Sequence, residues 1–424
     1  MKFHSTANPS GAQLDFGPAV IQGLAPDKGL YFPNDIPSLD PALWSSNNAL
    51  TPADLGFEIL APFVGDSLSD STLRRILKET LSFDFPLVEV GDRHALELFH
   101  GPTCAFKDVG ARFLARCIPE FSQGEVTVLV ATSGDTGSAV AQGFHNVKGV
   151  RVVLLYPSGR ISKAQELQLT TVGDNVVALE VDGAFDDCQA MVKAAFLNNS
   201  LQSIRPLVSA NSINIARWIP QSIYYAWTAH RLGPGLTFSV PSGNYGNLAA
   251  GLLAHKMGMP AAGFIAATNA NNIVPHYLET GEFKPKPSVA TISNAMDVGD
   301  PSNFIRLKRL FGDDREAFAR VVQGFTLNDD ATREVIATVH RTHGYLLDPH
   351  GAIAYAALDA HPAEKGVFLG TAAPAKFADV IKPVVGFEPE APAALAALID
   401  RQGQSIKIAG TPQALEDYLR GTIN

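Results

Sequence analysis

The sequence has few cysteines, no surplus of positive charge and no long apolar run. Its three cysteines, Cys104, Cys117 and Cys188, are too few for a disulfide framework and too scattered for a zinc site, so we expect a cytoplasmic, reducing compartment. The 33 Lys and Arg residues against 42 Asp and Glu residues leave a formal net charge of -9, which argues against a general nucleic-acid or membrane-surface binder. No stretch of about 18 apolar residues exists, and the N-terminus lacks the apolar run of a secretory signal.

The composition instead describes a globular chain. It has 424 residues, of which 46% are hydrophobic and 18% charged, so we expect two or three domains. The first 90 or so residues are punctuated by Pro and Gly and are predicted to be loop-rich and helical. Beyond them, short apolar runs predict buried strands at residues 87–90, 95–99, 126–132, 150–157, 175–181, 236–240, 263–271 and 366–374. Amphipathic stretches between the strands predict an α/β fold of parallel sheets covered by helices.

Ligands of open parallel sheets bind beyond the carboxyl ends of the strands, and one such end is especially rich in glycine. The run SVPSGNYGN, residues 239–247, leads into an Ala- and Leu-rich helix. Its glycines allow a tight turn, and the free N–H groups of the helix start would bind an anion such as phosphate. No Lys-Ser or Lys-Thr follows at the spacing of a P-loop. An ordinary tight turn between strand and helix is the alternative.

A second strand end, residues 131–138 (ATSGDTGS), is rich in hydroxyl side chains. Together with backbone N–H groups they predict a carboxylate-binding site. Helix capping is the alternative, because Ser, Thr and Asp are all good N-caps. A single cap needs only one such residue, so the density of hydroxyls favours a ligand.

A single lysine, Lys107, lies between a predicted strand and a predicted helix. Such lysines are commonly solvated surface residues. Lys107 nevertheless follows Phe106 and precedes an apolar helix, and a partly desolvated lysine can form a Schiff base. His100 in the same segment is interpreted as a turn residue, and Cys104 as a small buried residue.

A fourth cluster, residues 209–217, contains Asn211 and Ser212 at a predicted helix start and Arg217 among apolar neighbours. A buried arginine needs an anionic partner. A ligand phosphate and an internal carboxylate both satisfy that requirement, and the spacing does not choose between them.

Taken together, these segments resemble the threonine synthase family of fold-type II pyridoxal-phosphate enzymes, in its longer bacterial and fungal branch. The likeness spans nearly the whole chain, in the order QGLAPD, HGPTCAFKD, TSGDTGSA, YPSGRIS, NSINIAR, PSGNYGN, NAMDVGDPSNF, LDPHGA and GTAAPAKF. The family implies two doubly wound, parallel-rich sheets with helices on both faces. It also implies an N-terminal segment over 1–90, a small cofactor- and substrate-binding domain over 91–235 inserted in the large one, and a large cofactor domain over 236–424.

The resemblance also implies residue roles. Lys107 matches the catalytic lysine that carries pyridoxal 5'-phosphate, Asp135 the position beside the phenolic oxygen of the cofactor, and Thr371 the hydroxyl that meets the pyridine nitrogen. The residues matching the loop that binds the cofactor are Ser242, Gly243, Asn244, Tyr245, Gly246 and Asn247. The residues matching the group that binds the substrate carboxylate are Thr132, Ser133 and Thr136. Those matching the pocket for the substrate phosphate are Asn211, Ser212 and Arg217.

The implied activity is conversion of O-phospho-L-homoserine and water to L-threonine and phosphate by a monomer without metal. The sequence departs from the family where Ala373 replaces a frequent histidine and where Ser5-Thr6-Ala7-Asn8 replaces a Ser-Thr-Arg-Gly run. These departures leave alternatives open. One is a phospholyase of the same fold that releases 2-oxobutyrate and ammonia. The others are a non-catalytic homologue that binds the cofactor and an anion-binding domain without one.

Overall fold

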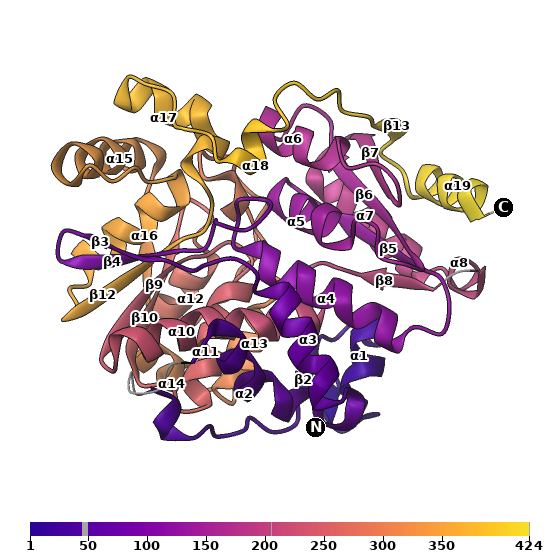
Figure 1. Cartoon of the computed structure of the whole chain (residues 1–424), viewed down its shortest axis with the longest axis horizontal. Coiled ribbons are helices and arrows are strands. Elements are labelled where there is room, and N and C mark those ends of the chain that lie inside the picture. Colours follow the sequence, from indigo (N-terminus) through magenta and orange to yellow (C-terminus); the bar gives the residue numbers. More distant parts are fainter. Residues whose placement is uncertain (45–49, 205, 424) are drawn as a thin grey trace.

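Two central sheets organise the computed structural model, which describes residues 1–44, 50–204 and 206–423 (Figure 1). The larger sheet has the order β11-β10-β9-β12-β4-β3. Its strands are β3 (Leu87–Val90), β4 (Arg93–Glu97), β9 (Leu236–Pro241), β10 (Ala261–Thr268), β11 (Val322–Thr326) and β12 (Lys365–Gly370). The smaller has the order β13-β7-β6-β5-β8. Its strands are β5 (Val126–Ala131), β6 (Val150–Pro157), β7 (Val176–Asp182), β8 (Leu207–Ser209) and β13 (Ile406–Ala409).

Every strand pair in these two sheets is parallel except β3 with β4. Parallel neighbours need crossover connections, which are usually helices. The helices up to the end of β8 are α1 (Phe16–Gln22), η1 (Pro41–Trp44), α2 (Pro52–Val64), η2 (Gly65–Ser67), α3 (Asp70–Thr80), α4 (Lys107–Phe121), α5 (Asp135–Phe144), α6 (Lys163–Thr170), α7 (Phe185–Leu197) and α8 (Asn199–Ile204). The next group runs from α9 (Ile215–Trp218) through η3 (Ile219–Gln221), α10 (Ser222–Leu232), α11 (Gly246–Lys256), α12 (Ile273–Thr280), η4 (Asn294–Met296) and α13 (Phe304–Leu310) to α14 (Arg315–Val321).

The remaining helices are α15 (Asp329–His343), α16 (Pro349–Ala360), η5 (Pro374–Phe377), α17 (Ala378–Val385), α18 (Ala393–Ala396) and α19 (Pro412–Ile423). Over the described ranges, no helix combines the length and the apolar character needed to cross a bilayer.

Both faces of each sheet are buried, as the near-continuous apolar runs predict. In β5, Val128 and Val130 belong to the main core, whereas Leu129 and Ala131 belong to a second core with α7 and α19. In the larger sheet, Phe368 faces a third core built on α15 and α16, while its neighbours on β12 face the main core. Successive side chains of a strand point to opposite faces, so helices cover both sides. The expected α/β fold with two doubly wound, parallel-rich sheets is confirmed.

The N-terminal segment is mostly loops and helices, as expected, but it also contains a small antiparallel pair. This pair joins β1 (Phe3–Ser5) and β2 (Tyr31–Pro33). The departure at residues 5–8 contributes to its docking. Ser5 donates to Asp27 Oδ1 at 2.6 Å, and Arg309 donates to the Thr6 carbonyl at 2.9 Å. The Ser5 side chain therefore stabilises the segment internally, and the Thr6 carbonyl connects it to α13.

The two sheets do not divide at the segment boundaries predicted above. Strand β4 falls within 91–235 but pairs in the larger sheet, and β13 falls within 236–424 but pairs with β7 in the smaller one. Figure 1 shows the C-terminal helix α19 lying beside the smaller sheet. The chain therefore crosses between the sheets more often than a simple insertion implies, and the domain boundaries stay a prediction.

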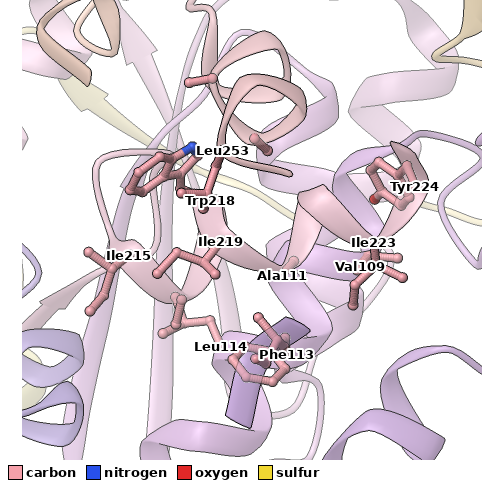
Figure 2. Close-up of a cluster of buried hydrophobic side chains, with 14 of the residues drawn as sticks. Val109, Ala111, Phe113, Leu114, Ile215, Trp218, Ile219, Ile223, Tyr224 and Leu253 are labelled. Atoms are coloured by element: carbon pink, nitrogen blue, oxygen red, sulfur yellow. The ribbon is translucent and has the colours of Figure 1, made fainter. Parts of the chain in front are cut away.

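A buried hydrophobic cluster fixes α4 against the segment formed by α9, η3 and α10 (Figure 2). From α4, Val109 and Leu114 pack in this cluster with Trp218 and Ile219, all of them at most 1% exposed. Helix α4 begins at Lys107 and α9 carries Arg217. Close packing allows little relative movement, so this cluster holds the two cationic residues in a fixed relation.

Candidate functional site

One cavity collects residues from the carboxyl ends of strands in both sheets. Its wall includes residues that follow β5, β9 and β12, together with the starts of α4, α7 and α11. Every candidate residue named from the sequence except Ser242 lines it, namely Lys107, Thr132, Ser133, Asp135, Thr136, Asn211, Ser212, Arg217, Gly243, Asn244, Tyr245, Gly246, Asn247 and Thr371. Ser242 instead donates its hydroxyl to the Val240 carbonyl at 2.9 Å and its N–H to the Ala267 carbonyl at 2.8 Å. It therefore has no donor left for a ligand.

The extension of β12 places Thr371 beside Lys107. Phe106 N–H donates to the Thr371 carbonyl at 2.9 Å, and Ala373 N–H donates to the Cys104 carbonyl at 3.1 Å. Lys107 follows as the first residue of α4, and Lys107 Nζ forms no hydrogen bond or ion pair with any described residue. Burial lowers the pKa of Lys107 to about 8, and the nearby Asp135 carboxylate only partly opposes this. A neutral amine is therefore accessible near neutral pH, as nucleophilic and basic roles require.

This pKa makes a direct prediction for the full-length protein freed of bound small molecules. Reaction of the Lys107 amine with an amine-selective reagent should reach its half-maximal rate near pH 8, because only the neutral amine reacts and its fraction rises through that pKa. Peptide mapping after timed labelling between pH 6 and 11 measures the profile. A lysine amide in the same buffers, with its ordinary pKa of 10.5, is the reference. A Lys107 profile that follows the reference would contradict the prediction.

Asp135, the first residue of α5, is a buried carboxylate with a buried cationic partner. Lys376 Nζ lies 2.6 Å from Asp135 Oδ1, and Gln165 donates to the same oxygen at 3.1 Å. Burial alone would raise the pKa of Asp135, but the charges of Lys376 and Lys107 hold it well below its usual range. Asp135 Oδ2 has no hydrogen-bond partner among the described residues, so the ionised carboxylate keeps one oxygen for the cavity.

The turn after β5 has one hydroxyl that caps the helix start and two that stay free, so capping and ligand binding, the two interpretations made from the sequence, involve different residues. The Thr132 hydroxyl accepts the N–H groups of Gly134 at 3.0 Å and Gly137 at 2.8 Å, so Thr132 acts as the capping residue of this turn. The hydroxyls of Ser133 and Thr136 have no partner within the described part of the chain, and both residues line the cavity. Two hydroxyls and the start of α5 therefore remain for an anionic ligand.

The glycine-rich turn after β9 fits a phosphate-sized anion. The first intrahelical bond of α11 runs from Ala249 N–H to the Tyr245 carbonyl, so the N–H groups of residues 246–248 have no intrahelical acceptor. Tyr225 donates its hydroxyl to Asn247 Oδ1, which leaves the buried Asn247 Nδ2 without a partner. A Cβ added at Gly246 would make only ordinary contacts of 3.4 Å or more with protein. The free space and the unused donors together make this turn suitable for an anion.

Arg217 has the burial and the free donors that suit a second anion. It is 2% exposed, donates to the Ala210 carbonyl, and leaves Nε unpartnered. No carboxylate among the described residues forms an ion pair with Arg217. The internal ion pair that the sequence left open is therefore excluded for these residues. Burial lowers the pKa of Arg217 to about 10, and a desolvated guanidinium gains most from an anionic ligand.

Ser212 and Asn211 lie beside Arg217 in the cavity wall. The Ser212 hydroxyl accepts amide donors from Asn244 at 2.8 Å and Asn303 at 3.0 Å, so its own proton is free to donate to an anion. Asn211 Nδ2 donates to the Ala131 carbonyl at 3.0 Å, which ties this loop to the end of β5. The fourth cluster named from the sequence thus lies together in the cavity wall, with donors that suit an anion.

Sequence reasoning missed several residues of the cavity wall. Phe185 and Gln189 reach it from α7, where no local motif marks them. His350 and the 295–302 loop belong to the quoted LDPHGA and NAMDVGDPSNF segments, which could have identified them. The buried His350 accepts the Ala295 N–H at its Nε2 and contacts Asp348 Oδ2 through Nδ1 at 2.5 Å. It therefore fixes the 295–302 loop over the cavity.

Two residues without an assigned role in the sequence analysis, Ala373 and His100, lie outside the cavity wall. Ala373, which replaces the frequent histidine, packs in a small buried cluster with Cys104 and Leu395. His100 is an exposed turn residue that contacts Glu97 at 2.6 Å. Neither Ala373 nor His100 lines the cavity.

Comparisons with known proteins agree with this geometry. The pattern of the pyridoxal-phosphate dependent enzyme family matches residues 95–371, flanked by the threonine synthase N-terminal pattern at 2–81 and C-terminal pattern at 351–419. Threonine synthase from Escherichia coli K12 is 42% identical over 396 residues, covering 92% of each chain.

Solved structures give the same relationship. The crystal structure of threonine synthase from Escherichia coli matches with a TM-score of 0.93 at 39% identity, covering 100% of both chains. The structure of threonine synthase with bound pyridoxal phosphate from Brucella melitensis matches with a TM-score of 0.92 at 34% identity, covering 99% of both. The chain therefore belongs to the threonine synthase family of pyridoxal-phosphate-dependent, fold-type II enzymes.

Proposed function

We propose that this protein converts O-phospho-L-homoserine and water into L-threonine and phosphate, with pyridoxal 5'-phosphate as cofactor. One observation carries the proposal. A single cavity combines an unpartnered lysine amine with two separate anion-binding positions, one at the start of α11 and one at Arg217. A cofactor phosphate and a substrate phosphate would account for both positions.

The residues around Lys107 fit pyridoxal phosphate. The turn 243–247 would hold its phosphate through backbone N–H groups and Asn247 Nδ2, while Asp135 would lie near the phenolic oxygen and Thr371 near the pyridine nitrogen. Lys107 would carry the cofactor covalently through Nζ. When bound, this cofactor supplies an electron sink for negative charge that develops at the substrate carbon.

The chain itself must bind the substrate and move its protons. Ser133 and Thr136 would hold the substrate carboxylate with their hydroxyls. The Lys107 amine, with its pKa near 8, would remove the proton from Cα and return it, because a base is most effective when its pKa lies near the working pH.

Loss of phosphate from Cγ creates negative charge that the protein must stabilise. The guanidinium of Arg217 and the free hydroxyl proton of Ser212 would donate to the departing phosphate. Their partners are fixed by backbone carbonyls and side-chain amides, so little reorganisation is needed as the charge develops. Loss of phosphate also requires removal of a proton from Cβ. Protonation of Cγ to form the methyl group, addition of water at Cβ and return of the Cα proton would then complete the proposed reaction.

We further propose that the enzyme acts as a monomer in the cytoplasm, in amino-acid biosynthesis, with residues 91–235 forming its small cofactor- and substrate-binding domain. Sedimentation at assay concentration tests the oligomeric state directly.

Product analysis tests the proposed reaction. Purified protein loaded with pyridoxal phosphate should release phosphate and L-threonine from O-phospho-L-homoserine in equal amounts, because water adds to the substrate before release. Chromatography of amino acids and a phosphate assay on the same sample measure the ratio, with unphosphorylated homoserine as the control substrate. Formation of 2-oxobutyrate and ammonia in place of threonine would identify a phospholyase. Cofactor binding without phosphate release would identify a non-catalytic homologue.

A further inference from the structure

A second buried lysine lies behind the cavity and has no part in the proposed reaction. Lys376 belongs to η5 (Pro374–Phe377), and its side chain is fully buried. Its Nζ lies 2.6 Å from Asp135 Oδ1 and donates to the Thr103 carbonyl at 3.0 Å. Lys376 is not part of the cavity wall, so it can influence a ligand only through other residues.

A charge in this position is costly for stability. Removing an ammonium group from water carries a large free-energy penalty, which a buried ion pair recovers only in part. Well-packed apolar residues of the same volume often replace such pairs without loss of stability. Stability alone therefore gives a weak reason for a lysine here, and its two partners point to a role in the site.

Those partners lie on two different segments of the cavity. Asp135 begins α5, whereas Thr103 belongs to the turn that leads into Lys107 and also donates its N–H and hydroxyl to Asp108. Lys376 itself follows Thr371 by one short turn. One ammonium group thus connects the segments that carry the amine, the carboxylate and the threonine of the cavity.

The pairing also determines which oxygen of Asp135 faces the ligand. Oδ1 accepts from both Lys376 and Gln165, while Oδ2 has no partner among the described residues. Without Lys376, Oδ1 would keep only Gln165 as a donor, and the carboxylate would lose its main neutralising charge. The charged groups that act on Lys107 are Asp135, Lys376 and Arg217, and those near Lys376 also include Asp108.

We propose that Lys376 is a positioning residue that holds Asp135 as a charged carboxylate with Oδ2 directed into the cavity and that, by its own charge, favours the neutral, reactive form of the Lys107 amine. The proposal deepens the function proposed above and rests on it for the ligand that Asp135 would meet. Its test does not depend on turnover.

The first variant is Lys376→Met, which keeps the length of the side chain and removes its charge. In the full-length protein without cofactor, we expect the pH midpoint of Lys107 labelling to rise by about one unit, since an adjacent charge shifts a pKa by about 1–3 units. The pKa of Lys107 shifts upward because its amine loses a repelling cation and because the Asp135 carboxylate is no longer neutralised by Lys376. The matched control is Lys382→Met, which should leave the midpoint unchanged. Lys382 lies on α17, is exposed and pairs with Glu388.

A second pair of variants keeps the test decisive if Lys376→Met fails to fold. Asp135→Asn should lower the Lys107 midpoint, because the attracting carboxylate is gone while Lys376 remains. The double variant Asp135→Asn/Lys376→Met should have a higher midpoint than Asp135→Asn, because the repelling ammonium is also gone. Equal midpoints in these two proteins, or an unchanged midpoint in folded Lys376→Met, would overturn the proposal.

These outcomes are separate from failure of the proposed function. Wild-type protein that forms no threonine would contradict the reaction but would leave the labelling midpoints of Lys107 unaffected. Active wild-type protein with unshifted variants would contradict only the role of Lys376. Cofactor-loaded Lys376→Met should in addition show a visible spectrum whose pH dependence differs from that of wild type, which a purely structural role would not produce.

Discussion

Replacing Lys107 with alanine should abolish threonine formation and the visible absorbance of bound cofactor together. Lys107 Nζ is the amine that the structure leaves unpartnered in a cavity holding two anion-binding positions. Loss of a positioned acid–base group alone costs about 10²–10⁴-fold in rate. Loss of the covalent attachment adds to that, so we expect turnover to fall by at least about 10⁴-fold. Absorbance spectra and steady-state assays of the same preparation measure both effects.

The matched control for this variant is Lys163→Ala. Lys163 is an exposed lysine at the start of α6. It should retain the spectrum and the activity of wild type. Circular dichroism should show that Lys107→Ala is folded, since removal of a half-buried lysine that makes no ion pair leaves no charge uncompensated. A Lys107→Ala protein that keeps both turnover and the visible band would refute the assignment of this residue.

Replacing Arg217 with alanine should weaken substrate binding and spare the cofactor. Charge-assisted hydrogen bonds contribute about 1.5–3 kcal/mol each, so losing one raises KM for O-phospho-L-homoserine by about 10–100-fold. The cofactor phosphate is expected at the start of α11, whereas Arg217 belongs to α9. The visible absorbance of bound cofactor should therefore stay unchanged. Substrate titration followed by absorbance, with inhibition by inorganic phosphate as a second readout, measures the two affinities.

Arg217→Lys separates charge from geometry at the same position. Lysine keeps the positive charge but lacks the planar fork that pairs two oxygens of a phosphate, so its KM should lie between those of wild type and the alanine variant. Arg217→Ala with unchanged affinity for both substrate and phosphate would show that the substrate phosphate binds elsewhere. Loss of cofactor absorbance in the same protein would instead place Arg217 at the cofactor.

Much of the site was predictable because its chemistry is local in sequence. The turns at 132–137 and 243–247 each follow a buried strand and begin a helix, so strand periodicity, glycine placement and the helix start together identify them. The place of Lys107 between Phe106 and an apolar helix only made it a candidate, and its role was implied by the family resemblance. The strand positions themselves followed from short apolar runs, and parallel pairing followed from their alternation with helices.

The same local rules did not predict which partner a polar side chain takes when the fold offers it more than one. Thr132 and Ser133 are adjacent hydroxyl residues, yet the first caps the turn and the second remains free. Ser242 belongs to the glycine-rich motif but turns its hydroxyl toward Val240. The direction of each side chain depends on backbone angles that the folded chain imposes, and residue type alone does not determine them.

Short apolar runs alternating with helical stretches predicted an α/β fold of parallel sheets, because these patterns are local. The resemblance of ordered segments along the chain implied the family, the two sheets and the roles of Lys107 and the turns. Three features required the folded chain: the lack of a carboxylate partner for Arg217 among the described residues, the return of β13 and α19 to the smaller sheet, and the pairing of Lys376 with Asp135. These contacts join segments far apart in the chain. Electrostatic pairing acts through space and depends on burial, so it is defined only once the two sheets have been packed together.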